Sequence, residues 1–343
     1  MSQEDHYISL AHGNGGRLMR ELIESTFRQQ LNRGQLDTDA DAVPLALPPN
    51  LSEAEVVITT DSFTVKPLEF PGGDIGSLAV HGTVNDLSVA GAKPLYLTLN
   101  AIIEEGLELA TLERLIRSLG KAADEAGVTV VAGDTKVVPR GEGSGLYLAT
   151  TGVGIRDPKI KLGMDYIEVG DQIVVSGPVG DHGTAVMLAR EEFGLSGELY
   201  SDNACVTPLF QSISHLSGLR FMRDPTRGGL ATVCHEIARA TGHTLRLHEE
   251  QIPVRAQVRS VCNILGYDPL FLACEGRVVA ILSTEQAEEA LHIWQQHPQG
   301  EGAAIIGAVT TSRGNDGEVT LKTKLGGERY LRELEEDPLP RIC

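Results

Sequence analysis

The segment from Leu109 to Lys136, LATLERLIRSLGKAADEAGVTVVAGDTK, indicates the fold class of this chain. Its first part places apolar residues three and four positions apart, which is the period of one helix face; they are Leu109, Leu112, Leu115, Ile116, Leu119 and Ala123. The run 128–132 is apolar throughout, as in a buried strand, and Gly133-Asp134-Thr135-Lys136 closes it. A helix followed at once by a buried strand predicts a domain that mixes both elements.

Further elements of both kinds flank this segment. In the first half the patterns predict strands over 55–61, 95–103 and 146–153, a helix over 74–91 and a polar surface loop over 37–53. In the second half they predict strands over 172–176, 303–310 and 318–324 and helices over 184–192, 230–240 and 327–335. Turn residues and mixed charge over 156–170 mark a domain junction, so we expect an α+β fold with two domains.

Composition argues against several classes of protein. The 343 residues suffice for two ordinary domains, 41% are apolar, and no apolar run is long enough to span a bilayer. A net charge of −18 repels nucleic acid and anionic lipid. The five cysteines are an odd number without a C-x-x-C pair, which disfavours a disulfide framework or zinc ribbon, and the acidic N-terminus does not resemble a signal peptide. We therefore expect a cytoplasmic protein.

A glycine-rich stretch near the N-terminus is a candidate phosphate site. Gly13-Asn14-Gly15-Gly16 precedes an apolar helical pattern at Leu18, Leu22, Ile23 and Phe27. A helix N-terminus presents unpaired N–H groups and the positive end of a dipole, both of which favour phosphate. An ordinary flexible turn fits this short motif equally well. The chain has no G-x-x-x-x-G-K-[ST] loop, so an ATP site here is not of the P-loop type.

Aspartates stand at or near the ends of apolar elements. They are Asp61, Asp86 and Asp134 in the first half and Asp224 in the second. A single acid at such a position is usually a helix cap or a turn former. Together, beside a candidate phosphate loop, they are better explained as oxygen ligands for Mg²⁺ bridging the phosphates of a nucleotide. Lys136 follows Asp134 by two residues, so on a strand it faces the same side, where it balances phosphate charge or serves the chemistry.

Glu275 interrupts an apolar stretch in the second half of the chain, LFLACEGRVVAIL, residues 270–282. A carboxylate at Glu275 either pairs with Arg277 or a lysine, or lies in a cleft of the kind that raises a carboxyl pKa. From sequence the ion pair is the more common outcome. The internal cysteines Cys205, Cys234 and Cys262 are expected to be small buried apolar residues.

The last seven residues, Asp337-Pro338-Leu339-Pro340-Arg341-Ile342-Cys343, finish on a thiol. Their two prolines exclude a continuing helix and favour an extended arm of about 20 Å. Arg341 favours the thiolate, although the terminal carboxylate opposes it. A cysteine that falls at a chain end by chance is the simpler interpretation, unless the rest of the chain offers such an arm a destination.

Six motifs in order give the chain a family resemblance. They are Gly13-Asn14-Gly15-Gly16, Thr60-Asp61, Asn85-Asp86 followed by Gly91-Ala92-Lys93-Pro94-Leu95, Gly133-Asp134-Thr135-Lys136, Gly180-Asp181-His182-Gly183 and Asp224-Pro225-Thr226-Arg227-Gly228-Gly229. Together they resemble the ATP-binding superfamily of aminoimidazole-ribonucleotide synthetase (PurM), which also holds selenophosphate synthetase and thiamine-monophosphate kinase. The terminal Pro340-Arg341-Ile342-Cys343 is similar to the signature of the HypE family, the hydrogenase-maturation carbamoyl dehydratases.

The resemblance implies an α+β, PurM-like architecture of two domains. In it the N-terminal domains pair through their sheets in a homodimer and hold ATP and Mg²⁺ near that interface. The corresponding divisions of the chain are a glycine-rich loop and helix (1–36), an ATP-binding domain (37–157), a C-terminal α+β domain (158–326) and a helix with a mobile tail (327–343).

The resemblance also implies a reaction. A HypF-type carbamoyltransferase loads a carbamoyl group on Cys343, the chain dehydrates that group to a thiocyanate with ATP, and a HypC–HypD complex accepts the cyanide for the iron of [NiFe]-hydrogenase. Residues 13–16, Asn85 and the four aspartates would bind nucleotide or metal, while Glu275 and Lys136 would act as bases.

Two alternatives stay open. One is a sister enzyme that phosphorylates a free small molecule, although His12-Gly13-Asn14-Gly15 lacks the cysteine or selenocysteine of selenophosphate synthetases. The other is a non-catalytic carrier of a modified thiol, which leaves the acids and glycine loops without a role. The sister enzyme, in turn, does not explain Cys343.

Overall fold

The computed structural model describes residues 7–9, 12, 21–31, 54–190, 198–312 and 317–333. The glycine-rich stretch 13–16, the predicted loop 37–53 and Cys343 therefore lie outside the described residues. The chain divides into two compact units, and each unit has its own sheet. Unit 1 runs to Leu87 and from Ala92 to Asp157, and unit 2 holds Ser88–Gly91 and the described residues from Pro158 to Glu333.

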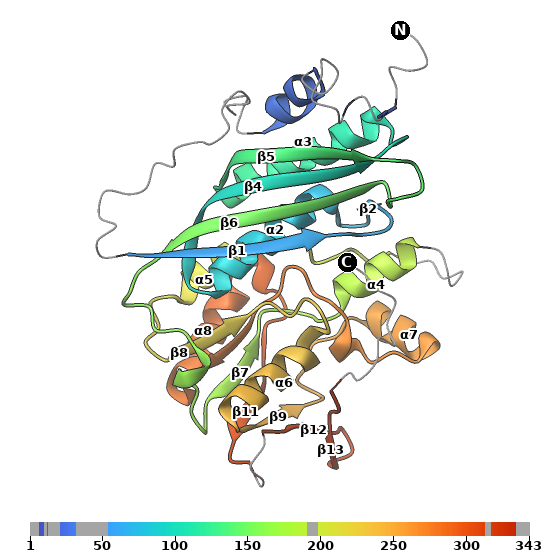
Figure 1. Ribbon diagram of the computed structural model, residues 1–343. Coiled ribbons are helices and arrows are strands. Elements are labelled where there is room, and N and C mark those ends of the chain that lie inside the picture. Colours follow the sequence, from blue (N-terminus) through green and yellow to red (C-terminus); the bar gives the residue numbers. More distant parts are fainter. Residues whose placement is uncertain are drawn as a thin grey trace. The chain divides into compact units, whose positions relative to one another are not determined.

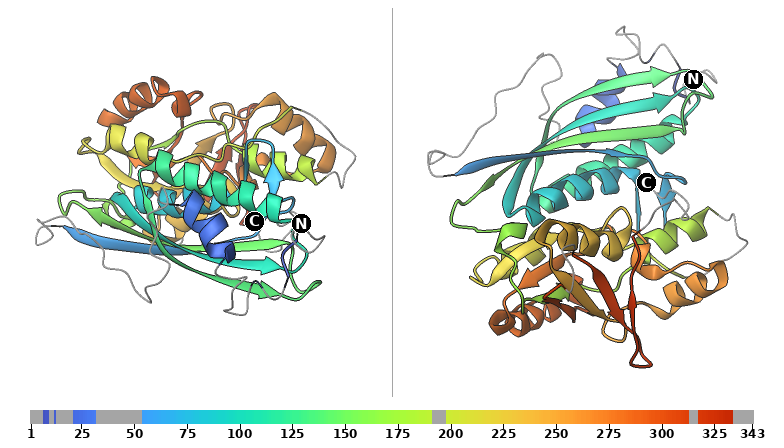
Figure 2. Two further views of the ribbon diagram at one scale, coloured as in Figure 1. Left: turned by 90° about the horizontal axis from the view of Figure 1, so that it is seen from above. Right: turned by 60° about the horizontal axis from the view of Figure 1, so that its bottom comes forward.

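Unit 1 is a four-stranded sheet covered by helices on one face (Figures 1 and 2). Its strands are β1 (Glu55–Phe63), β6 (Leu146–Arg156), β4 (Ala92–Glu104) and β5 (Thr129–Val138), in that order across the sheet. β4 and β5 are parallel and joined by α3 (Leu109–Ala126), whereas β6 is antiparallel to both β1 and β4. The other elements are α2 (Ile75–Val89), a π-helical turn η3 (Ile23–Arg28) and the short strands β2 (Glu69–Phe70) and β3 (Gly73–Asp74).

Burial alternates along the strands of unit 1. In β4, Leu97, Leu99, Ala101 and Ile103 are buried towards the helices, while Ile102 on the other side is 40% exposed. The predicted apolar stripe of α3 is confirmed, because Leu112, Leu115, Ile116, Leu119 and Ala123 are all buried. Among the described residues, no helix covers the outer face of this sheet, which carries Ile102 and which we call the open face.

Unit 2 is a seven-stranded sheet with helices on both faces (Figure 1). The order across the sheet is β13 (Glu328–Tyr330), β12 (Val319–Lys322), β9 (Thr244–His248), β11 (Ala304–Thr310), β7 (Gln172–Val175), β10 (Val279–Leu282) and β8 (Leu219–Arg223). Its helices are α4 (Asp181–Ala189), α5 (Thr207–Ile213), α6 (Gly229–Thr241), α7 (Ala256–Leu265) and α8 (Thr284–Gln295), with short turns η6 (Met164–Tyr166), η7 (Pro269–Phe271) and η8 (Pro298–Gly300).

Two apolar cores enclose this second sheet. Val279 and Ile281 of β10 belong to the core under α6, whereas Ala280 and Leu282 belong to the core under α5 and α8. The alternation follows from the strand period of two, which sends neighbouring side chains to opposite faces. Within the described residues, no helix is both long and apolar enough to cross a membrane.

The predicted helix over 327–335 is wrong for the part of it that the structure describes. Residues 328–330 form β13, which pairs antiparallel with β12. Thr323 and Gly327 close the hairpin, and the Glu328 carboxylate accepts hydrogen bonds from Thr320 and Arg246 of neighbouring strands. These cross-strand contacts outweigh the local helical preference of a charged run, because propensity is a weak guide when tertiary partners are available.

Candidate functional site

Asp61 and Asp86 share the helix-covered side of unit 1. Asp61 pairs across the sheet with Thr150, which is buried and donates a hydrogen bond to the carbonyl of Ala79 in α2. Thr59 lies two residues before Asp61 on the same face, and its Oγ1 donates to Asp86 Oδ2 of α2 at 2.9 Å. These contacts place the two predicted acids in one layer, with Asn85, which is 1% exposed, next to Asp86 in α2.

Asp134 and Lys136 lie on the open face. The prediction that they share a side is confirmed, since Lys136 Nζ is 3.5 Å from Asp134 Oδ2 and both side chains are exposed. The prediction that the acid closes its strand is wrong, because β5 continues to Val138. Asp134 pairs with Asn100, which pairs with Ala149, the neighbour of Thr150 in β6. Since successive residues alternate, Asp134 points away from the side that holds Asp61.

Asp134 is therefore separated from Asp61 and Asp86 within one copy of the chain. Throughout the described residues there is no group of three or more His, Cys, Asp or Glu side chains able to hold a metal ion. A protein-only metal cage is thus absent from this part of the chain. One or two carboxylates on a strand and its covering helix do fit Mg²⁺, which usually takes its other ligands from phosphates and water.

Glu275 lies in a loop of unit 2 that several motifs hold in place. It is 4% exposed, and its N–H donates to Asp202 Oδ1 at 3.1 Å. The preceding Cys274 N–H donates to the carbonyl of Pro225, next to Asp224, at 3.0 Å. Gly183 N–H, from the Gly180–Gly183 motif, donates to the carbonyl of Ala273 at 3.0 Å. Two motifs that are distant in sequence thus meet at this loop.

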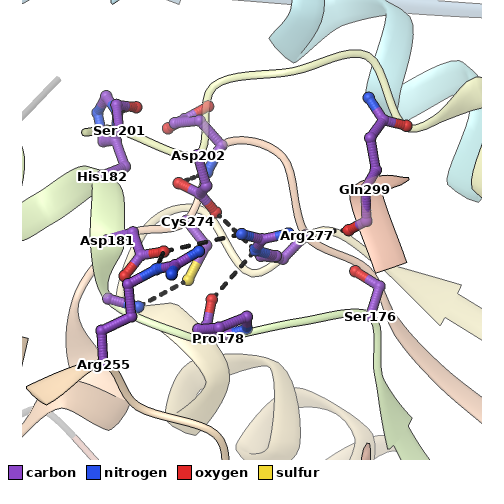
Figure 3. Close-up of polar contacts among 12 residues, drawn as sticks. Ser176, Pro178, Asp181, His182, Ser201, Asp202, Arg255, Cys274, Arg277 and Gln299 are labelled. Carbon is purple, nitrogen blue, oxygen red and sulfur yellow. Dashed lines mark hydrogen bonds and ion pairs between the residues drawn. The ribbon is translucent and has the colours of Figure 1, made fainter. Parts of the chain in front are cut away.

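A buried charge cluster lies beside the loop (Figure 3). Arg277 forms ion pairs with Asp202 at 3.4 Å and with Asp181 at 3.7 Å, and Arg255 Nε donates to Asp181 Oδ2 at 2.8 Å. Burial raises the pKa of Asp181, an effect that the Arg255 hydrogen bond opposes and the charge of Asp202 reinforces. Two acids are thus held close together by two arginines.

Buried neutral groups surround the cluster. His182 is fully buried, and its Nδ1 lies 2.8 Å from Ser201 Oγ, while burial lowers its pKa to about 4. Gly180 N–H donates to Cys274 Sγ at 3.2 Å, and burial raises the pKa of that thiol well above its usual value. An imidazole and a thiol in this environment are neutral near pH 7.

The internal cysteines are poor nucleophiles. Burial raises the pKa of Cys234 to about 12 and of Cys262 to about 11, and it raises the pKa of Cys205 as well. The predicted burial of Cys234 and Cys262 is confirmed, whereas Cys205 is only partly buried. Because the thiolate is the reactive form, the described thiols are unsuited to accept a group.

Sequence reasoning missed most of this cluster. Asp181 was only part of a glycine motif, and Asp202 lies in a polar stretch, Ser201-Asp202-Asn203, that carries no pattern. Arg277 was expected as a partner of Glu275, and its described ion pairs are with Asp181 and Asp202. The sequence signal that could have indicated the cluster is the number of charged residues close to apolar strands. A charge that is buried beside such a strand requires a partner of opposite charge.

The two units match family models of the two domains of one kind of protein. Residues 39–156 match the N-terminal domain of AIR synthase related proteins, and residues 168–320 match the C-terminal domain of the same proteins. The fold and its acids thus define a PurM-like protein of two α+β domains.

Matches to relatives over nearly the full chain identify the particular family within this class. The carbamoyl dehydratase HypE of Azotobacter vinelandii is 45% identical over 337 residues, covering 98% of this chain and 97% of that protein. A crystal structure of the hydrogenase maturation protein HypE in complex with ATP is 43% identical, with a TM-score of 0.90 and coverage of 97% of this chain and 99% of that one. A HypE chain from a HypE–HypF complex is 40% identical, with a TM-score of 0.78, and covers 93% and 100%. The chain belongs to the HypE family.

Proposed function

We propose that this protein is an ATP-dependent carbamoyl dehydratase that acts on its own Cys343. The carbamoyl group on the thiol loses water and becomes a thiocyanate, which supplies the cyanide ligand for the iron of [NiFe]-hydrogenase. The observation that carries the proposal is the 45% identity, over nearly the full length of both chains, to a relative named carbamoyl dehydratase HypE. The raised pKa values of the internal thiols favour Cys343 as the acceptor.

The chemistry explains the need for ATP. Converting S–C(=O)–NH₂ to S–C≡N removes one oxygen and two protons, and oxide is a very poor leaving group. Transfer of the ATP γ-phosphoryl group to the carbamoyl oxygen converts that oxygen into part of a phosphate, which departs readily. This step depends on positioning and charge neutralisation rather than on covalent help from the protein.

The predicted site residues divide the work. Gly13–Gly16 would cradle phosphate, and Asp61 and Asp86 would hold Mg²⁺, with Asn85 beside them. Asp134 and Asp224 are the further candidate ligands for nucleotide or metal. When bound, Mg²⁺ neutralises charge on the phosphates. Glu275 and Lys136 remove the two nitrogen protons, and the burial of Glu275 at 4% exposure supports its role in a water-poor site.

The open face supports the proposal of a homodimer. Val56 and Ile58 of β1 are 55% and 68% exposed, and Ile102 of β4 is 40% exposed on the same side. Exposed apolar side chains on an uncovered sheet face favour burial against a partner. Pairing two open faces would place Asp134 and Lys136 of one copy at the interface with the second copy.

The same proposal covers partners and compartment. A HypE chain similar to this one was crystallised with HypF, which supports a HypF-type carbamoyltransferase as the donor to Cys343. A HypC–HypD complex is proposed as the acceptor of the cyanide. All of these steps require reduced thiols, so we place the protein in the cytoplasm.

Mass spectrometry of the C-terminal peptide tests the function. With a HypF-type carbamoyltransferase, carbamoyl phosphate and ATP, Cys343 should gain a carbamoyl group and then lose one water. A carbamoyl group that stays intact after ATP is supplied contradicts the proposal and favours the non-catalytic carrier. Consumption of ATP with a free small molecule and an unmodified thiol favours the sister enzyme.

A further inference from the structure

We propose that Asp202 is a positioning residue for Glu275, with Arg277 as its counter-ion. The inference rests on the proposed role of Glu275 as a base, and it adds a residue that has no place in the motifs of the sequence. All three side chains come from unit 2, and Asp202 and Arg277 are drawn in Figure 3.

Asp202 holds the Glu275 backbone directly. Its side chain is fully buried, and its Oδ1 accepts the Glu275 N–H at 3.1 Å. The two segments are also in backbone contact, since a Cβ on Gly276 would lie 1.8 Å from the Asp202 carbonyl oxygen and 3.0 Å from Ala204 N. Only glycine allows this approach, so the loop that carries Glu275 is pressed against the backbone of Asp202.

Arg277 anchors the chain two residues after Glu275. Its Nε donates to the Pro178 carbonyl at 3.1 Å and its Nη1 donates to the Gln299 carbonyl at 3.0 Å. A Cβ on Gly177 would lie 2.7 Å from Nη1, so the guanidinium fills the space beside that glycine. With Asp202 Oδ2 at 3.4 Å from Nε, the two charges neutralise each other in a buried place.

The loop is therefore anchored at two points, at Glu275 itself and at Arg277. The anchor at residue 275 itself is the N–H bond to Asp202, and the anchor two residues later is the guanidinium of Arg277. A buried aspartate and arginine rarely separate, because either charge left alone carries a large desolvation cost. This arrangement fixes the backbone from which the carboxylate projects.

Position matters for a base. A general base acts only within hydrogen-bond reach of the proton it takes, and a displacement of about 1 Å costs on the order of 100-fold in rate. An anchor that moves the carboxylate by such a distance alters the rate of proton removal and leaves ATP binding unchanged. A residue that only stabilises the fold has no such selective effect.

The test compares Asp202→Asn and Asp202→Ala with Asp171→Asn. Asparagine keeps the acceptor for Glu275 N–H and removes the charge, whereas alanine removes both. Asp171 is a matched control, because it is also buried, accepts the Glu168 N–H at 2.8 Å and lies 3.8 Å from Arg220 Nε. The readouts are the single-turnover rate of water loss from carbamoylated Cys343, KM for ATP, and hydrogen exchange of the segment 272–278.

We expect the rate to fall roughly 10-fold in Asp202→Asn and roughly 100-fold in Asp202→Ala, with KM for ATP unchanged and faster exchange in the segment. Asp171→Asn should stay within about twofold of the parent. A folded Asp202→Ala protein with the parent rate overturns the proposal, as does an equal loss in Asp171→Asn. If alanine prevents folding, a parent rate in Asp202→Asn overturns it.

A second variant approaches the same contact from the loop. Gly276→Ala adds a Cβ against the Asp202 carbonyl, so it should reproduce the rate loss while keeping every charge. A parent rate in that variant also counts against the proposal. If the parent protein itself shows no water loss, the proposed function fails, and hydrogen exchange still reports whether Asp202 holds the Glu275 amide.

Discussion

Acidification should destabilise unit 2 through His182. The imidazole is fully buried, and burial lowers its pKa from 6.5 to about 4. The unfolded chain therefore binds a proton near pH 6.5, whereas the folded chain binds it only near pH 4. The stability that the neutral imidazole contributes is fully present above pH 6.5, and it is lost as the pH falls from 6.5 to about 4.

The magnitude follows from the two pKa values. With 6.5 for the unfolded chain and about 4 for the folded one, linkage gives almost no cost at pH 7 and a cost of about 2–3 kcal/mol at pH 4.5. The His182 contribution to the change is thus roughly 2 kcal/mol. His182→Asn keeps a polar group near Ser201 Oγ and cannot take up the proton, so it should lack this part of the pH dependence.

Urea unfolding at pH 7 and pH 4.5 measures the difference. The chain has one tryptophan, Trp294, which is fully buried in unit 2, so its fluorescence reports on the unit that holds His182. The free energy of unfolding of the parent should fall by about 2 kcal/mol more than that of His182→Asn. His215→Asn, at an exposed position of the same unit, is the control and should follow the parent. Equal pH dependence in the parent and His182→Asn refutes the reasoning.

Three further predictions address the chemistry, the dimer and the tail. Glu275→Gln should bind ATP and accept the carbamoyl group yet lose water at least about 100-fold more slowly, and a parent rate in mass spectrometry would place the base elsewhere. Ile58→Glu should convert the dimer to a monomer in sedimentation analysis, whereas Tyr330→Glu, exposed in unit 2, should not; a persisting dimer contradicts the open-face interface. One alanine added after Cys343 should slow dehydration several-fold at unchanged stability, and a parent rate would show that the position of the thiol is not restricted.

Local patterns predicted the elements that depend on local forces. The stripe of α3 was predictable because its buried residues recur at the helical period, and Gly127, at φ +69°, ends the helix in a conformation that glycine favours. The strand 328–330 was not, because its partners are Thr320 and Arg246, which the charged run alone does not reveal. Periodicity reports the face that an element buries and gives no information on its partner.

In the candidate site, too, local patterns predicted some features and missed those that depend on distant residues. The common side of Asp134 and Lys136 followed from the strand period alone. The cluster of Asp181, Asp202 and Arg277 did not, because its members are separated along the chain and meet only through the loops of unit 2. A buried ion pair leaves no periodic signal, since each member alone looks like an ordinary surface charge.

Strand register explains why Asp61 and Asp134 lie on opposite faces of the sheet, although the sequence suggested one site for both. Asp61 and Asp134 each lie on a strand of the same sheet, which made a common metal site attractive. Their sides depend on register: Asp61 pairs with Thr150, while Asp134 reaches Ala149 through Asn100, one residue out of phase. A shift of one residue reverses the face of a side chain. Asp134 lies on the same uncovered sheet face as the exposed isoleucines, so the pairing of two copies that we propose would place this acid at the interface between them.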